Sequence, residues 1–224
     1  MYISAAIQGL IRGSVDSLRQ FVCGPQGDVK ASQFLPEYAQ LVAEGVVWRS
    51  QEASATASVT ALPTDAGLYT LGNNEPDDGK WYVLLAVTAF NSANAAAFDS
   101  FGLAACVSQL PAVTGGISTT LAQDVAKTTI KNLAGVRGGG YSGRAILDTG
   151  VTIVDDGWFP ISGNSGSTAI NSSKGVTMWH WLHGVVILPP KTLISIVGTA
   201  TDTGNTTRKG FVWAEIPKNW LLAS

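Results

Sequence analysis

Charged residues are scarce in this chain. They make up 13% of its 224 residues, against roughly 25% in an ordinary soluble domain. Hydrophobic residues reach 46%, which is enough for a sizeable core. Because charge is depleted at the cores of protein interfaces, the composition leaves two interpretations. The chain is either a neutral β-protein of the secreted type or a protein whose surface is largely covered by partners.

Basic residues are too few and too scattered for a nucleic-acid-binding surface. The chain has 14 Lys and Arg against 16 Asp and Glu, a net charge of −2. A phosphate-binding surface needs clustered basic side chains. No apolar run reaches the ~18 residues of a membrane span. The sequence therefore predicts neither a nucleic-acid partner nor a membrane partner.

Cysteine and histidine are also rare, which argues against a metal centre or a disulfide framework. Cys23 and Cys106 are the only cysteines, and His180 and His183 are the only histidines. A zinc site would need further ligands, and a disulfide-stapled domain would carry more cysteines. We expect buried, unbridged cysteines, although one bridge stays possible, and structural histidines.

No motif in the sequence indicates catalysis. The glycine-rich run 135–143 does not end in Gly-Lys-Ser/Thr, as a phosphate loop would. The acidic pairs at 77–78 and 155–156 lack the spacing of a calcium loop, and turn formation explains them. A glycan-processing enzyme would need two carboxylates across a cleft. We expect a non-enzyme without cofactor or metal.

The first part of the chain differs in composition from the rest. Residues 34–42 repeat apolar positions at three- and four-residue spacing, as a short helix does. The small, polar stretch Arg49–Ser58 suits a linker. We interpret residues 1–58 as a partly helical or extended arm for attachment, and 59–224 as a domain that folds without it. Apolar residues at roughly helical spacing also occur earlier, at Ile3, Ile7, Leu10, Ile11 and Leu18.

From Val59 onward the pattern predicts an all-β fold, a sandwich or barrel. Short apolar runs alternate with clusters of turn-forming residues. Trp81–Phe90 is apolar at nearly every position, so both of its faces should be buried. A lone sandwich would show polar alternation on most of its strands. We therefore expect a homo-oligomer in which a second copy covers the extra apolar face.

Tryptophan, present seven times, is the most suggestive residue type. Trp179 and Trp181 alternate with Met178 and His180, and a strand places these two sets on opposite faces. One set should enter the core and the other should meet something outside the sheet. Such aromatic residues close a core, anchor a protein interface or stack on sugars. The candidate partner contacts are Phe34, Tyr38, Trp48, Trp179 and Trp181.

Four stretches carry a resemblance to a known family. They are His183–Gly198, Gly210–Pro217, Gly79–Asn91 and the alanine-rich Asn94–Ala97. Together they resemble tailed-bacteriophage virion proteins of the trimeric jelly-roll type, over about residues 60–217. The shared features are patterns of apolar residues, glycine and proline. Lys191 stands where the family pattern often has glycine.

The resemblance implies a jelly-roll-like antiparallel β-sandwich with a structural role on the phage particle surface. Proteins of this type decorate or cement capsids, or serve as head-fibre and tail components, and they have no catalytic residues. The implied partners are two further copies of the chain and a major capsid or other virion protein. A carbohydrate-binding jelly-roll module is the alternative, because jelly rolls host many functions.

Overall fold

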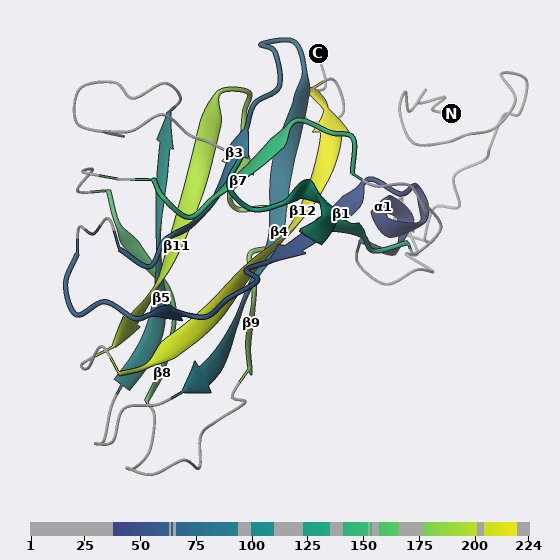
Figure 1. Cartoon of the computed structure of the whole chain (residues 1–224). Coiled ribbons are helices and arrows are strands. Elements are labelled where there is room, and N and C mark those ends of the chain that lie inside the picture. The colour runs from purple at the N-terminus through teal and green to yellow at the C-terminus, as the bar shows by residue number, and fades with distance from the viewer. Residues whose placement is uncertain are drawn as a thin grey trace, which may run out of the picture.

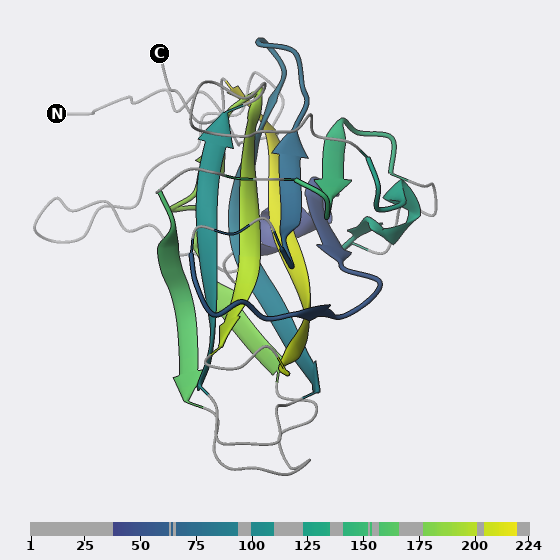
Figure 2. The same ribbon diagram turned by 60° about the vertical axis from the view of Figure 1, so that its left-hand side comes forward.

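The fold is a β-sandwich of two antiparallel sheets, as predicted (Figures 1 and 2). The structure is a computed structural model that describes residues 38–62, 64, 66–93, 100–109, 123–134, 141–151, 153, 157–165, 177–200 and 204–218. Phe34, Cys23 and the rest of the predicted arm before Tyr38 lie outside these residues, so predictions about them stay predictions.

The larger sheet is built around two long antiparallel strands, β4 and β12. Its order is β10-β4-β12-β1-β6, with β9 also paired to β4 and β2 also paired to β12. The strands are β1 (Val47–Gln51), β2 (Thr56–Ala57), β4 (Lys80–Ala93), β6 (Lys131–Asn132), β9 (Thr177–Trp181), β10 (Ile187–Leu188) and β12 (Thr206–Pro217).

The smaller sheet has β11 at its centre, in the order β7-β3-β11-β5-β8. Its strands are β3 (Tyr69–Asn73), β5 (Ser100–Gln109), β7 (Ala145–Asp148), β8 (Phe159–Ser165) and β11 (Thr192–Ala200). Helix is confined to α1 (Ala39–Ala43) and one 3-10 turn, η1 (Lys127–Thr129), in the described part of the chain. None of the helices described there has the length and apolar character to cross a membrane.

The main core fills the space between the two sheets. Trp213 of β12 is fully buried there, together with Tyr82 and Leu84 of β4. The rings of Tyr69 and Phe211 join the two sheets, with centroids 5.4 Å apart and planes 17° from parallel. Stacked rings of this kind contribute beyond the area that they bury.

Both sheets also carry apolar clusters on their outer faces. On the larger sheet, Val83 and Leu85 of β4 lie with Val212 and Ala214 of β12, and Tyr38, Leu41 and Val42 pack over them. The prediction that β4 is buried on both faces is confirmed. The chain's own segment around α1 therefore covers part of the face that the apolar run Trp81–Phe90 led us to assign to a second copy.

Apolar residues also cover the outer face of the smaller sheet. Cys106 of β5 is fully buried in an outer cluster with Leu68 and Val197, and Val151 and Ile153 pack on it. The expected burial of this cysteine is confirmed. Because Cys23 lies outside the described residues, the expectation that the two cysteines do not bridge stays a prediction.

The predicted linker at Arg49–Ser58 is wrong, because this stretch belongs to the sandwich. Strand β1 pairs along its whole length with β12 and on its other side with β6, and β2 also pairs with β12. The stretch looked like a linker because it is small and polar. Yet Ser50 and Glu52 are buried, so these polar side chains face the protein interior instead of water.

Candidate functional site

Two tryptophans stand on the outer face of β9. This strand pairs with β4 so that Trp179 lies opposite Thr88 and Trp181 opposite Ala86. The two indole side chains are 49% and 47% exposed, whereas Met178, on the opposite face of the strand, is buried in the main core. The predicted division of this strand into an inner and an outer face is confirmed.

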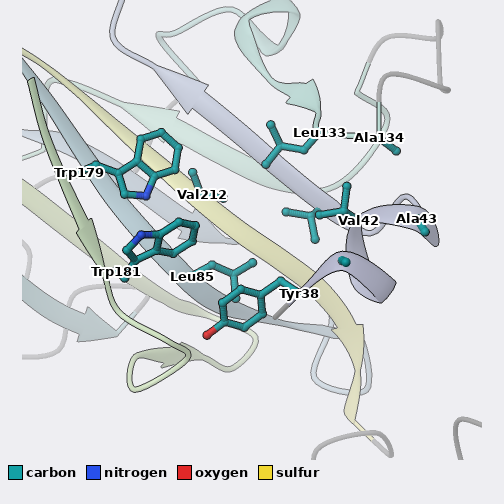
Figure 3. Close-up of a pocket in the computed structure, with 11 residues that line it drawn as sticks. Tyr38, Val42, Ala43, Leu85, Leu133, Ala134, Trp179, Trp181 and Val212 are labelled. Atoms are coloured by element: carbon teal, nitrogen blue, oxygen red, sulfur yellow. The ribbon is translucent and has the colours of Figure 1, made fainter. Parts of the chain in front are cut away.

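These tryptophans form one wall of a groove of about 560 Å³. Figure 3 shows the indoles on one side, Val42 and Ala43 of α1 on the other, and Leu85 and Val212 between them. We call this the aromatic groove. None of its lining residues is charged: Tyr38, Ala39, Val42, Ala43, Val47, Leu85, Leu133, Ala134, Trp179, Trp181 and Val212.

The aromatic side chains of the groove contact one another in a continuous row. Tyr38 stacks on Trp181 with ring centroids 6.2 Å apart and planes 19° from parallel. Trp179 lies 5.5 Å from Trp181 at a tilt of 55°. His183 contacts both rings: it stacks on Trp181 with centroids 6.0 Å apart, and its Nδ1 is hydrogen-bonded to the Tyr38 hydroxyl at 3.2 Å. The row thus links the segment before α1 to β9 and the turn after it.

Backbone strain is concentrated in the same row. Tyr38 has φ 64° and His183 has φ 48°, and Lys191 is the one other non-glycine residue with positive φ in the described ranges. This left-handed region is uncommon for residues other than glycine, although histidine is among the enriched types, and it persists where the surroundings hold it. The mutual contact of Tyr38 and His183 therefore fixes the aromatic row in one geometry.

The structure brings together three of the five candidate contact residues. Tyr38, Trp179 and Trp181 line the groove. Trp48 does not, because it packs against the inter-sheet core, edge-on to Tyr141 at 4.9 Å. Phe34 lies outside the described residues. Sequence reasoning missed Leu133, Ala134 and the apolar floor, which come from segments far apart in the chain.

A buried carboxylate, Glu215, lies inside the sandwich and not in the groove. Tyr141 donates a hydrogen bond to its Oε1, Trp213 Nε1 donates to the same oxygen at 3.3 Å, and Lys80 Nζ lies 3.4 Å from Oε2. Burial raises the pKa of the Glu215 carboxyl, against the lowering effects of Tyr141 and Lys80. Both carboxylate oxygens of Glu215 have a hydrogen-bonding or ionic partner. A structural role inside the sandwich therefore explains why this carboxyl group is buried.

Glu215→Gln is expected to weaken the pH dependence of stability. The folded carboxyl binds its proton more tightly than the unfolded one, whose pKa is about 4.3. Stability is therefore full below that value and falls as pH rises through the folded pKa. Glutamine is neutral at every pH, so the Tm of the variant relative to the native protein should increase as pH rises from about 4 through the raised pKa of Glu215. The exposed Asp78→Asn variant serves as control, and an unchanged difference across this range would contradict the expectation.

In the described part of the chain, no three His, Cys, Asp or Glu side chains gather where they could hold a metal ion. His183 is engaged with Tyr38 and Trp181, which fits the structural role predicted for it. The predictions that the protein is not an enzyme and takes no cofactor stay predictions.

Comparison with known proteins adds little. No family model and no curated protein matches the chain. One similar solved structure is a chain of Israeli acute paralysis virus, from a full particle heated to 63 degrees. It is 9% identical, with 96% of this chain and 86% of that chain covered, at a TM-score of 0.22. A TM-score this low supports no inference about fold or role.

Proposed function

We propose that this chain is a non-enzymatic virion structural protein that decorates or cements a tailed-phage capsid. The observation that carries the proposal is the aromatic groove, an uncharged hollow with two half-exposed tryptophans on a strand of the sandwich. The sequence resemblance over residues 60–217 supports the virion setting. It also supports assembly as a homotrimer on a major capsid or other virion protein.

The chemistry of the groove favours protein over charged ligands. Tryptophan and tyrosine are enriched among the residues that dominate binding energy at interfaces, and interface cores are depleted in charge. A tryptophan buries on the order of 200 Å², and about half of each indole of Trp179 and Trp181 is still exposed. Covering both would contribute about 5 kcal/mol at ~25 cal/mol per Å².

The fixed geometry of the groove lowers the cost of binding. Trp179 and Trp181 stand on a strand hydrogen-bonded to β4, and Tyr38 is held by stacking and by its hydrogen bond to His183. Side chains that are already ordered lose little conformational entropy when a partner covers them. This suits a protein that works through many repeated non-covalent contacts.

Replacing both tryptophans, Trp179→Ser with Trp181→Ser, is expected to weaken attachment to the particle by about 100-fold or more, because two aromatic anchors are lost. The buried halves of the two indoles also contribute to stability, so thermal denaturation has to show that the double variant is folded at the assay temperature. Co-sedimentation with particles lacking the protein, followed by electron microscopy, measures attachment. Val107→Ser on β5, also exposed, is the matched control. Undiminished attachment of the double variant would refute the proposed role of the groove.

Carbohydrate binding is the second candidate function. Trp179, Trp181 and Tyr38 supply ring faces on which a sugar can stack, and the Tyr38 hydroxyl and His183 supply polar groups nearby. The 55° tilt between the indoles and the otherwise apolar lining favour a protein partner. Calorimetric titration with host surface oligosaccharides tests this. Binding that the double variant loses, with particle attachment unchanged, would establish the second candidate.

A further inference from the structure

Polar side chains gather between the two sheets, on the inner side of the larger sheet. Lys209 of β12 and Glu52, which follows β1, form an ion pair there, with Nζ 3.0 Å from Oε2. Ser50 lies two residues before Glu52 and so shares its face of the strand. Tyr69 of β3 reaches the same place from the smaller sheet. All four side chains are buried, and we call them the polar cluster.

Three buried oxygens of the polar cluster have no hydrogen-bond partner among the described residues. They are Glu52 Oε1, Ser50 Oγ and the Tyr69 hydroxyl oxygen. The other carboxylate oxygen of Glu52 is satisfied, because Lys209 donates to it from Nζ and from its backbone N–H at 3.1 Å. Native proteins satisfy nearly all of their buried polar atoms, so three unsatisfied atoms in one place point to a common partner.

The three oxygens lie close to one another. The Tyr69 ring stacks on Phe211, and Phe211 is the residue that pairs with Ser50 between β12 and β1. Burial raises the pKa of the Tyr69 phenol, the nearby Ser50 hydroxyl lowers it, and the charge of Glu52 raises it further. Tyr69 is therefore within interaction range of both residues, and one small molecule can contact all three.

Small residues and further hydroxyl groups line this end of the interior. Ala89 of β4 lies opposite Lys209 in the larger sheet. Across from it, Gly198 of β11 has no side chain, and Thr207 Oγ1 and Ser58 Oγ lie 2.8 and 2.9 Å from the position that a Cβ there would take. These two hydroxyls also lack a hydrogen-bond partner in the described part of the chain. This end of the interior is therefore polar, and no large apolar side chain at these positions fills it.

We propose that a water molecule bound inside the sandwich bridges Glu52 Oε1, Ser50 Oγ and the Tyr69 hydroxyl. Water can donate to the carboxylate and to the serine oxygen while it accepts from the phenol, and about three hydrogen bonds are typical of a buried water. Because Lys209 already balances the charge of Glu52, the site favours a neutral molecule over a cation. Its burial favours the smallest molecule that can form these bonds. This inference does not depend on the proposed function.

High-resolution crystallography of the full chain tests the site directly. We expect a density peak at about 2.6–3.2 Å from all three oxygens. Thr70 and Ser195 are the internal control, because these buried hydroxyls are bonded directly to each other and should have no peak between them. A direct hydrogen bond between Ser50 and Tyr69, with no peak at Glu52 Oε1, would overturn the inference. A peak with contacts of about 2.4 Å, as a calcium ion makes, would also overturn it.

A variant that lacks two of the three partners supplies the second measurement. Ser50→Ala with Tyr69→Phe leaves only Glu52 to hold the water, fewer than the two to four polar partners that a buried water needs. Oxygen-17 magnetic relaxation dispersion counts long-lived internal waters, and we expect the count to fall by one. Thr70→Val with Ser195→Ala is the matched control and should leave the count unchanged. An equal count in the first variant and the native chain would refute the inference, and if that variant does not fold, the crystal structure of the native chain decides.

Discussion

A chain that begins at Ser58 is expected to be unfolded. The truncation removes β1, which pairs with β12 from Val47↔Ala214 to Gln51↔Gly210. It also removes β2 and Glu52, the ionic partner of the fully buried Lys209. The unpaired buried charge alone costs about 3–5 kcal/mol, a large part of the roughly 5–15 kcal/mol that stabilises a typical domain, and the lost pairing of β1 and β2 with β12 adds to this cost. Far-ultraviolet circular dichroism and thermal denaturation measure the outcome.

A chain that begins at Tyr38 is the matched control. It keeps α1 and all the strands of the described structure, so we expect β-sheet circular dichroism and a cooperative unfolding transition. A folded protein that begins at Ser58 would contradict the place of β1 in the sheet. It would instead support the arm boundary at residue 58 that the sequence suggested.

Lys209→Met is expected to reduce the free energy of unfolding by about 3–5 kcal/mol, the usual effect of breaking a buried ion pair. Lys209 Nζ lies 3.0 Å from Glu52 Oε2, and both side chains are almost completely buried. The Nζ is also hydrogen-bonded to the Thr56 hydroxyl. Without the ammonium, the Glu52 carboxylate is left as an uncompensated buried charge. Urea denaturation with an unchanged m-value gives the measurement.

The double variant Lys209→Met with Glu52→Gln separates charge from packing. Glutamine can still accept the hydrogen bond that the Lys209 backbone N–H donates to Glu52 at 3.1 Å, and it carries no charge. We expect the double variant to recover more than half of the stability lost by Lys209→Met. If the single variant costs less than about 1 kcal/mol, the pair behaves like a solvated surface ion pair and the argument from burial is wrong.

The ion pair between Lys209 and Glu52 could not be predicted from the sequence. Lys209 lies in β12, and burial lowers the pKa of its amine against the raising effect of Glu52. Nothing local to either residue marks the pair, because 157 positions separate them along the chain. Pairing of β1 with β12 brings them together. Because Glu52 lies in a small, polar stretch, the sequence pattern placed it in a linker. The predicted boundary between the arm and the sandwich, at residue 58, is therefore too far along the chain.

The sequence by itself determined the fold class and the two faces of β9. Period-two alternation is local and follows from strand geometry, so Trp179 and Trp181 could be separated from Met178 without a structure. The unbroken apolar run in β4 likewise predicted burial on both faces. Tyr38 was named from the sequence as a candidate partner contact and lines the groove, although its contact with Trp181 and His183 was not foreseen.

Only the tertiary structure decided what covers the second face of β4. The sequence argument assigned that face to a second copy, but Leu41 and Val42 of α1 pack over Val83 and Leu85 within one chain. The aromatic groove beside them combines α1, β1, β4, β9 and β12 with Leu133 and Ala134. Contacts between segments this distant depend on strand order and register, which a local pattern of residues does not contain.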